Sequence, residues 1–350
     1  MKSIHHVYFK NSQNMSNIPS DSVALVVTSP PYPMIKMWDE LFSDQNVRIG
    51  KSLSDENGMA AFELMHKNLD SVWNETWRVV KNGGFVCINI GDATRTLNDV
   101  FALYPNHSRI VSHMLKLGFN ALPEILWRKQ TNAPNKFMGS GVLPAGAYVT
   151  LEHEHILIFR KGGKRNFKIN SEKINRRESS FFWEERNLWF SDIWMDLKGT
   201  VQKLSDAKTR KRSAAFPFEI PYRLINMFSV KGDTVLDPFI GMGTTTLAAI
   251  AACRNSIGYE LEQGFQDLIF SGIDNIISYS NERVDKRITK HLSFVEERIK
   301  NGKEFKYINK YYNFSVITRQ ETELILNKLI SVKQYSKNQI KAAYLDNPQD

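Results

Sequence analysis

Cysteine is scarce in this chain of 350 residues, which contains only Cys87 and Cys253. Two cysteines exclude a disulfide framework and argue against a cysteine-rich zinc site. The sequence also lacks any run of about 18 apolar residues, and the first residues, 1–6, lack the apolar core of a signal peptide. These absences predict a protein of a reducing compartment, the cytoplasm, with no membrane segment.

Acidic residues are outnumbered, because 46 Lys and Arg stand against 37 Asp and Glu, a formal net charge of +9. Nearly all of this excess lies in residues 160–212, where 15 basic residues stand against 7 acidic ones. The segment suits either contact with a polyanion or a solvated basic face around packed aromatic rings. Its clustered basic and aromatic residues are Arg160, Lys161, Lys164, Arg165, Arg176, Arg177, Phe181, Phe182, Trp183, Trp189, Trp194 and the run Lys208–Arg212.

A buried strand is predicted at residues 23–28, where an apolar, β-branched run ends at Ser29-Pro30-Pro31-Tyr32. Two consecutive prolines cannot donate backbone hydrogen bonds, so the chain leaves the sheet in a rigid turn whose carbonyls are free to accept. The serine hydroxyl and a proline carbonyl suit the amine of a flat ring, and the tyrosine can stack on that ring. A plain turn with a packed tyrosine fits the tetrapeptide equally well.

A second motif spans residues 230–246, where a short strand leads into Asp-Pro-Phe-Ile-Gly-Met-Gly-Thr (237–244) and an alanine-rich helix follows. A strand, a glycine turn and a helix bring a nucleotide-like ligand close to backbone amides. The apolar stretch after the helix ends in Glu260, 23 residues beyond Asp237. An acid at that spacing (~20 residues) takes ribose hydroxyls in nucleotide-binding units.

The glycine loop departs from both common phosphate loops. Thr244 stands where a Walker-type loop needs lysine, and Thr246 replaces the third glycine of the dinucleotide pattern. An acid ahead of the glycines would repel phosphate, but it suits a cationic ligand with an amino-acid moiety. These features favour S-adenosylmethionine.

Together the two motifs resemble those of the DNA amino-methyltransferases, which methylate exocyclic nitrogens of cytosine or adenine. In that family the Ser-Pro-Pro-Tyr motif holds the target amine and the Phe-x-Gly-x-Gly motif holds S-adenosylmethionine. The catalytic motif precedes the cofactor motif by about 200 residues here, the permuted order of the family's β group. Residues 215–221 (Ala-Phe-Pro-Phe-Glu-Ile-Pro) resemble the segment ahead of the cofactor strand in that group. Neither cysteine follows a proline, which argues against a cytosine-C5 enzyme.

The resemblance covers residues 4–265 and implies an α/β fold, a Rossmann-like sheet with permuted motif order, an inserted DNA-recognition segment and a helical C-terminal tail. The expected segments are a catalytic half (1–159), a target-recognition segment (160–212), a cofactor half (213–265) and a helical extension (266–350). The implied catalytic residues are Ser29, Pro30, Pro31 and Tyr32, without a metal. The implied cofactor-binding residues are Phe216, Pro217, Asp237, Pro238, Phe239, Gly241, Gly243, Thr244 and Glu260.

A serine at the first position is typical of the N4-cytosine enzymes of this family, whereas N6-adenine enzymes mostly carry Asp or Asn. We therefore expect transfer of a methyl group from S-adenosylmethionine to cytosine N4 in double-stranded DNA. The expected partners are DNA and a cognate restriction endonuclease, and the chain is expected to be a monomer or homodimer. An adenine target, an RNA or protein-glutamine acceptor, and a DNA-binding module without chemistry stay open as alternatives.

Several further residues have both structural and functional interpretations. His153 and His155 lie on one face of a strand predicted at 153–159, and we expect them to be structural because a metal pair would need more ligands. Asp92, after a strand predicted at 85–90, suits an active site or a turn. Trp127 suits contact with a flipped base or the core. Asn11-Ser12 stands where the family places an acid near the adenine of the cofactor.

Overall fold

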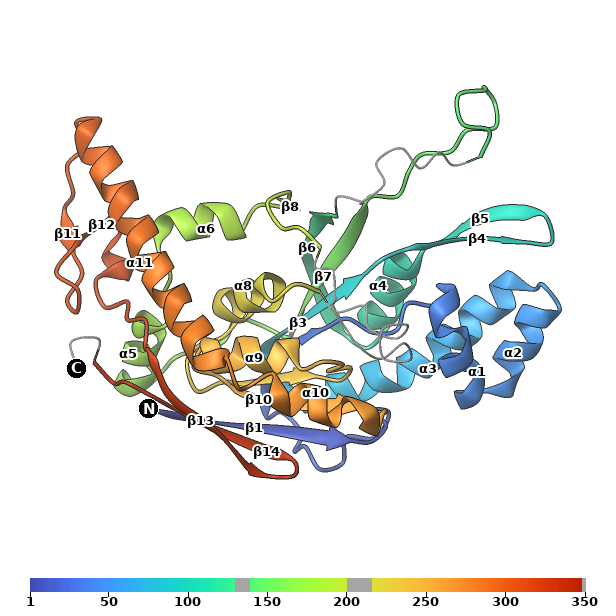
Figure 1. The fold of residues 1–350 in the computed structure, drawn as a ribbon, viewed down its shortest axis with the longest axis horizontal. Helices are drawn as coiled ribbons and strands as arrows, with labels where there is room; N and C mark the ends of the chain where they lie inside the picture. The colour runs from blue at the N-terminus through green and yellow to red at the C-terminus, as the bar shows by residue number, and fades with distance from the viewer. Residues whose placement is uncertain (130–138, 200–215, 348–350) are drawn as a thin grey trace.

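The computed structural model describes residues 1–129, 139–199 and 216–347; the basic run Lys208–Arg212 and Ala215 lie outside them. Within these ranges ten strands form one sheet, in the order β13-β14-β1-β10-β9-β2-β3-β7-β6-β8 (Figure 1). The strands are β1 (Lys2–Phe9), β2 (Val23–Thr28), β3 (Val80–Ile90), β6 (Phe119–Arg128), β7 (His153–Lys161), β8 (Ile193–Trp194), β9 (Thr234–Asp237), β10 (Asn255–Glu260), β13 (Leu329–Ser336) and β14 (Gln339–Tyr344). Two separate pairs are β4 (Ala93–Leu97) with β5 (Val100–Tyr104) and β11 (Tyr307–Ile308) with β12 (Ser315–Val316).

Helices connect these strands and cover both faces of the sheet. They are α1 (Asp39–Gln45), α2 (Val47–Ser54), α3 (Gly58–Val79), α4 (Asn106–Lys116), α5 (Asn170–Glu178), α6 (Trp183–Trp189), α8 (Glu219–Phe228), α9 (Thr244–Ala251), α10 (Gln266–Ser271) and α11 (Ile276–Lys300), with short 3-10 turns η1 (Lys36–Trp38), η2 (Gln263–Phe265) and η3 (Arg319–Glu321). No helix in the described ranges is both long and apolar enough to cross a bilayer.

The centre of the sheet is the parallel set β1, β10, β9, β2 and β3. Strands β9 and β10 of the cofactor half lie between β1 and β2 of the catalytic half. All of these strands point the same way, so their carboxyl ends meet at one edge, which we call the catalytic edge. The predicted α/β sheet with permuted motif order is therefore confirmed.

Strand β2 shows why the central strands read as continuous apolar runs. All six of its residues are buried, because both faces of a parallel sheet are covered. Val26 packs into the core beneath α3 and α4, whereas Leu25 and Val27 pack into the core beneath α8 and α9. Because successive side chains of a strand point to opposite faces of the sheet, one apolar run contributes side chains to both cores.

The C-terminal extension departs from the expectation of a helical tail. Helices α10 and α11 are present, but residues beyond 300 form β11, β12, β13 and β14 instead. Strand β14 pairs antiparallel with β1, and the N-terminal amine forms an ion pair with Asp346, so the last described strand lies beside the first (Figure 1). The reason is that β1 has an open edge, and the alternating burial of β14 fits it to cover that edge.

The expected target-recognition segment and the C-terminal extension pack together as one unit. Phe182, fully buried, joins Val284 of α11 and Leu324 in a small separate core. The Phe182 ring also stacks on His291 at 4.1 Å between centroids. An ion pair of 2.6 Å between Glu185 and Arg287 ties the same two segments. These contacts join the two segments in space although the cofactor half separates them in the chain.

We predict that Phe182→Ala lowers the free energy of unfolding by about 3–5 kcal/mol, because it empties a fully buried site shared by two segments. Leu188→Ala, on the exposed side of α6, is the matched control and should change it by less than about 0.5 kcal/mol. Urea titration followed by far-ultraviolet circular dichroism measures both. Equal stability of the two variants would contradict the shared core.

Candidate active site

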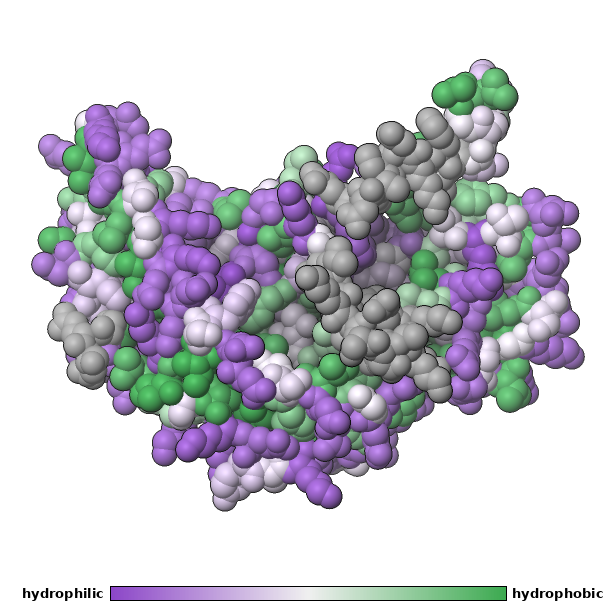
Figure 2. Space-filling model, viewed as in Figure 1, coloured by the Kyte–Doolittle hydropathy of each residue, from purple (hydrophilic) through white to green (hydrophobic). Residues whose placement is uncertain are grey.

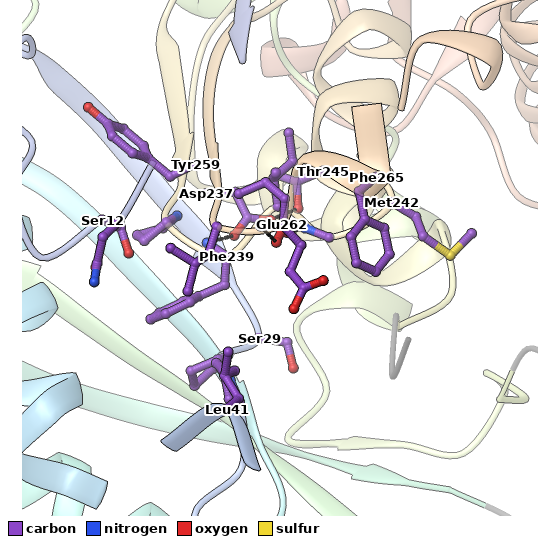
Figure 3. A pocket seen from close by; sticks show the side chains of 18 of the residues that line it. Ser12, Ser29, Leu41, Asp237, Phe239, Met242, Thr245, Tyr259, Glu262 and Phe265 are labelled. Atoms are coloured by element: carbon purple, nitrogen blue, oxygen red, sulfur yellow. Dashed lines mark hydrogen bonds between the residues drawn. The ribbon is translucent and has the colours of Figure 1, made fainter. Parts of the chain in front are cut away.

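A cavity of about 1020 Å³, including the part open to solvent, lies at the catalytic edge (Figure 3). Strands β2, β9 and β10 end there, and each delivers a predicted functional residue just past or at its last position. The cavity is lined by Lys10, Asn11, Ser12, Ser29, Pro30, Pro31, Trp38, Leu41, Gln45, Phe216, Asp237, Pro238, Phe239, Ile240, Gly241, Met242, Thr244, Thr245, Tyr259, Glu260, Leu261, Glu262 and Phe265.

The structure brings the two predicted motifs to this one cavity although about 200 residues separate them in the chain. Among the predicted site residues, Tyr32, Pro217 and Gly243 are not part of the lining. Pro217 accepts the first backbone hydrogen bond of α8, from Ile220, and Gly243 begins α9 with φ of 83°. These two residues shape the elements that carry the lining rather than the cavity surface itself.

We call Ser29-Pro30-Pro31 the catalytic turn. The side chain of Tyr32 lies on the side of this turn that faces away from the cavity. Its hydroxyl is 3.1 Å from Ser29 Oγ, and it contacts the Asn89 amide and the Glu154 carboxylate at 2.9 Å each. Its ring packs against Gly91, where an added Cβ would come within 3.0 Å of the tyrosine Cε2. Burial and the nearby Glu154 carboxylate raise the pKa of Tyr32 well above its ordinary value, so the hydroxyl keeps its proton. Stacking of this ring on a base stays a prediction.

Asp237 is a structural bridge inside the cavity wall. Its carboxylate accepts hydrogen bonds of 2.6 Å from Thr28 at the end of β2 and 2.6 Å from Thr245 in α9. The Phe239 amide donates a third bond of 3.0 Å. Burial raises the pKa of Asp237 to about 6, against the opposing effect of these donors. The residue thus orders the glycine loop and joins it to the catalytic strand.

The glycine loop and Glu260 form the part of the cavity that fits a nucleoside with an amino-acid tail. Gly241 has φ of 51°, and an added Cβ there would meet nothing within 4 Å, so a ligand can approach its backbone. Glu260 accepts hydrogen bonds from the Gly241 and Glu262 amides at 3.0 and 2.9 Å. Burial raises the pKa of Glu260 to about 7. Glu260 lines the cavity, and its contact with ribose hydroxyls stays a prediction.

Sequence reasoning missed a large part of the cavity wall. Helix α1 and the turn before it contribute Trp38 and Leu41, and the segment after β10 contributes Glu262 and Phe265. Figure 3 shows Phe265 and Met242 along one side of the cavity, well away from Tyr259 and Ser12. These residues belong to no sequence motif. They line the cavity because the loops that contain them leave the sheet at the catalytic edge. Asn11-Ser12, considered for the adenine end, does line the cavity.

A histidine cluster lies beside the catalytic turn. Asp92, His107 and His155 bring potential metal-ligand atoms within 4.8 Å of one another. The His107 and His155 rings stack at 4.0 Å with only 13° between their planes, so their in-plane lone pairs do not converge on one ion. Asp92 instead accepts from the backbone amide and Nδ1 of His107, at 3.0 and 2.7 Å. That hydrogen bond raises the pKa of His107 and holds the first turn of α4.

Trp127 belongs to the core. It is 1% exposed, and its indole nitrogen donates to the Leu197 carbonyl at 2.9 Å. Trp189 and Trp194 are buried as well, at 4% and 1% exposure. Of the two interpretations of these aromatic residues, the described positions support packing rather than contact with a base.

The first part of the basic segment lies at the edge of the sheet opposite the catalytic edge. Arg165 forms an ion pair of 2.5 Å with Asp233, the residue just before β9. Lys161 donates at 2.8 Å to the Val80 carbonyl at the start of β3. Further on, Asn175 of α5 donates at 2.8 Å to the carbonyl of Lys231, also ahead of β9. Residues 160–178 are therefore far from the ends of β2 and β9 where the cavity opens.

Comparison with known proteins identifies the family to which this fold and site belong. A family model described as DNA methylase matches residues 23–271. The type II methyltransferase M.MthZI of Methanothermobacter thermautotrophicus is 53% identical over 98% of this chain and 96% of its own length. M.MjaI of Methanocaldococcus jannaschii is 51% identical over 76% of this chain and 89% of its own length. The structure of TTHA0409 from Thermus thermophilus with S-adenosyl-L-methionine has a TM-score of 0.61, with 30% identity, over 78% of this chain and 95% of that one.

The fold and cavity are therefore those of an S-adenosylmethionine-dependent methyltransferase. The chain belongs to the N6/N4 DNA methylase family, the DNA amino-methyltransferases. The resemblance read from the two motifs is confirmed, and so is the cofactor class.

We predict that affinity for S-adenosylmethionine weakens as pH falls through about 7, by up to about tenfold per pH unit, because a protonated Glu260 accepts ribose hydroxyls less well. Isothermal titration calorimetry across this range measures the effect. Glu260→Gln should bind more weakly and lose most of the pH dependence. An affinity of the unsubstituted protein that is flat across this range would contradict the assignment.

In the protein without cofactor, the raised pKa of Glu260 changes the free energy of unfolding with pH in the opposite direction to the cofactor affinity. The folded state holds the Glu260 proton more tightly than the unfolded chain does, so its free energy of unfolding falls as pH rises from 4.5 toward about 7. The gain in melting temperature from added cofactor should therefore be larger on the alkaline side of that interval.

Proposed function

We propose that this protein methylates the N4 amine of cytosine in double-stranded DNA within a restriction–modification system. The observation that carries the proposal is that the Ser29 hydroxyl lines the same cavity as the glycine loop and Glu260. The serine form of the motif favours cytosine over adenine by family resemblance. The names of the relatives M.MthZI and M.MjaI as type II methyltransferases support the restriction–modification setting.

The residues of the catalytic turn act by position. Ser29 Oγ and the Pro30 carbonyl accept hydrogen bonds from the exocyclic amine, and this turns its lone pair away from the ring and toward the cofactor side of the cavity. S-adenosylmethionine, when bound, supplies the methyl group. The glycine loop and Glu260 hold its amino-acid and ribose ends, and Phe216 covers its exposed side.

A base inside a duplex cannot enter a cavity of this size, so the target base must leave the helix. The surface supports a duplex at the catalytic edge. Figure 2 shows the molecule hollowed between two projections, one formed by the far end of α11 with β11 and β12, the other by the loop around residues 140–148. That loop continues from the catalytic-edge ends of β6 and β7.

The direct test is transfer of labelled methyl groups from S-adenosylmethionine to unmethylated duplex DNA, with nucleoside analysis of the digest. We expect the label in N4-methylcytosine. Label in N6-methyladenine would keep the enzyme class and overturn the base. Absence of label on DNA, with cofactor bound, would overturn the proposal and favour RNA, a protein glutamine, or a DNA-binding module without chemistry.

The cations that contact DNA should be those of the catalytic edge. Lys36 follows the catalytic turn, Arg128 ends β6, and Lys198 follows the Leu197 carbonyl that accepts from Trp127. All three are exposed. Lys164 and Lys168 are equally exposed but lie in the segment at the opposite edge. Part of the predicted basic segment is therefore reassigned away from the DNA.

We predict that replacing Lys36, Arg128 or Lys198 by alanine weakens DNA binding. The slope of log affinity against log salt should fall by about one unit for each phosphate that the variant no longer neutralises. Fluorescence anisotropy with a labelled duplex at several salt concentrations measures the slope. The matched controls, Lys164→Ala and Lys168→Ala, should leave it unchanged. Reversal of these two outcomes would move the DNA to the opposite edge.

A further inference from the structure

Glu154 is a buried acid on β7, which is separated from the catalytic strand β2 by β3, and the sequence motifs give it no role. It is 9% exposed on β7. Its Oε1 accepts from Lys129 Nζ at 2.9 Å, and its Oε2 accepts from Asn89 Nδ2 at 2.7 Å. Lysine and amide nitrogens can only donate, so both carboxylate oxygens are acceptors. The Tyr32 hydroxyl also lies 2.9 Å from Oε2.

These contacts fix the direction of the Tyr32 proton. A carboxylate with no proton can only accept, so the tyrosine donates its single proton to Glu154. The tyrosine oxygen then keeps two lone pairs. One accepts from Asn89 Nδ2 at 2.9 Å, and the other faces Ser29 Oγ at 3.1 Å. Ser29 must therefore be the donor in its contact with Tyr32.

The direction of the Ser29 proton determines how Ser29 can bind the target amine. A serine hydroxyl that donates its proton to Tyr32 presents only lone pairs to the cavity. The amine of a base presents N–H donors, which these lone pairs can accept. We propose that Glu154 is a positioning residue that polarises the chain Ser29–Tyr32–Glu154, so that Ser29 faces the target amine as an acceptor. Hydrogen bonds in such a chain strengthen one another inside a protein. This inference rests on the function proposed above.

The chain also accounts for the proton that methylation releases. When the N–CH3 bond forms and the S–CH3 bond breaks, the electron pair of that bond stays on sulfur and the amine nitrogen gives up one proton. The proton passes to Ser29 Oγ as Ser29 gives its own to Tyr32 and Tyr32 gives its own to Glu154. Charge and atoms balance without any further reactant, and Glu154 ends as a neutral acid whose Oε1 can still accept the hydrogen bond from Lys129.

Glu154→Gln keeps the shape of the chain but removes the charge that polarises it. The glutamine oxygen takes the position of Oε2, where Tyr32 and Asn89 donate, because an amide nitrogen there would face the Asn89 Nδ2 donor. A neutral amide does not take up the proton that Tyr32 passes on. Tyr32→Phe removes the hydroxyl, so Ser29 loses the acceptor that orients its proton and Glu154 no longer acts on it.

We expect Glu154→Gln to lower kcat by about 10- to 100-fold, with little change in cofactor or DNA affinity. Tyr32→Phe should lower kcat at least as far as Glu154→Gln. The double variant should match Tyr32→Phe, because Glu154 acts on Ser29 only through the Tyr32 hydroxyl. Glu124→Gln, which removes a carboxylate facing His155 on the neighbouring strand, is the control and should keep the kcat of the unsubstituted enzyme.

Single-turnover methyl transfer to duplex DNA gives the rates, and calorimetry with anisotropy gives the affinities. Label on DNA with the unsubstituted enzyme tests the proposed function; the order of the variants tests the chain. A Glu154→Gln variant as fast as the unsubstituted enzyme would overturn the inference. So would a double variant slower than Tyr32→Phe, because additive losses indicate general damage to the site rather than one shared hydrogen-bond chain.

Discussion

The site depends on the hydrogen bonds that the Asp237 carboxylate accepts from Thr28 and Thr245, at 2.6 Å each. Thr28 is the last residue before the catalytic turn, and Thr245 lies in the first turn of the helix that follows the glycine loop. One buried carboxylate thus fixes the distance between the turn that we propose orients the target amine and the loop that we propose holds the cofactor. Methyl transfer needs that distance to be held closely, because a small displacement of reacting groups slows a reaction strongly.

The sheet makes this contact possible. Strands β9 and β10 enter between β1 and β2, so motifs far apart along the chain end side by side at the catalytic edge. Both faces of the central strands are buried by helices from both halves of the chain. Neither half has a complete sheet of its own. The C-terminal strand β14 then covers the open edge of β1 and joins the last part of the chain to the first.

Two buried acids, Asp237 and Glu154, and the partly buried Glu260 lie around the proposed reaction centre, and each accepts hydrogen bonds from the protein. Asp237 holds two hydroxyls, Glu260 holds backbone amides, and Glu154 holds a lysine, an amide and the Tyr32 hydroxyl. Such acids orient loops and hydrogen-bond chains before any ligand arrives, which lowers the reorganisation that the reaction requires. Their burial raises the pKa of Asp237 and Glu260, and we therefore expect cofactor binding to depend on pH.

The sequence by itself determined the family, the cofactor class, the two motifs and the central strands, because buried parallel strands and proline or glycine turns leave strong local patterns. It also placed Ser29, Asp237 and Glu260 correctly at strand ends. Tertiary structure alone decided what lies between these motifs. It set Tyr32 behind the cavity, put Trp127 in the core, turned residues 160–178 to the opposite edge, and folded the tail beyond 300 into strands. Those outcomes depend on which edge of the sheet a segment reaches and on which other segment covers it. Neither can be derived from composition or charge along the chain.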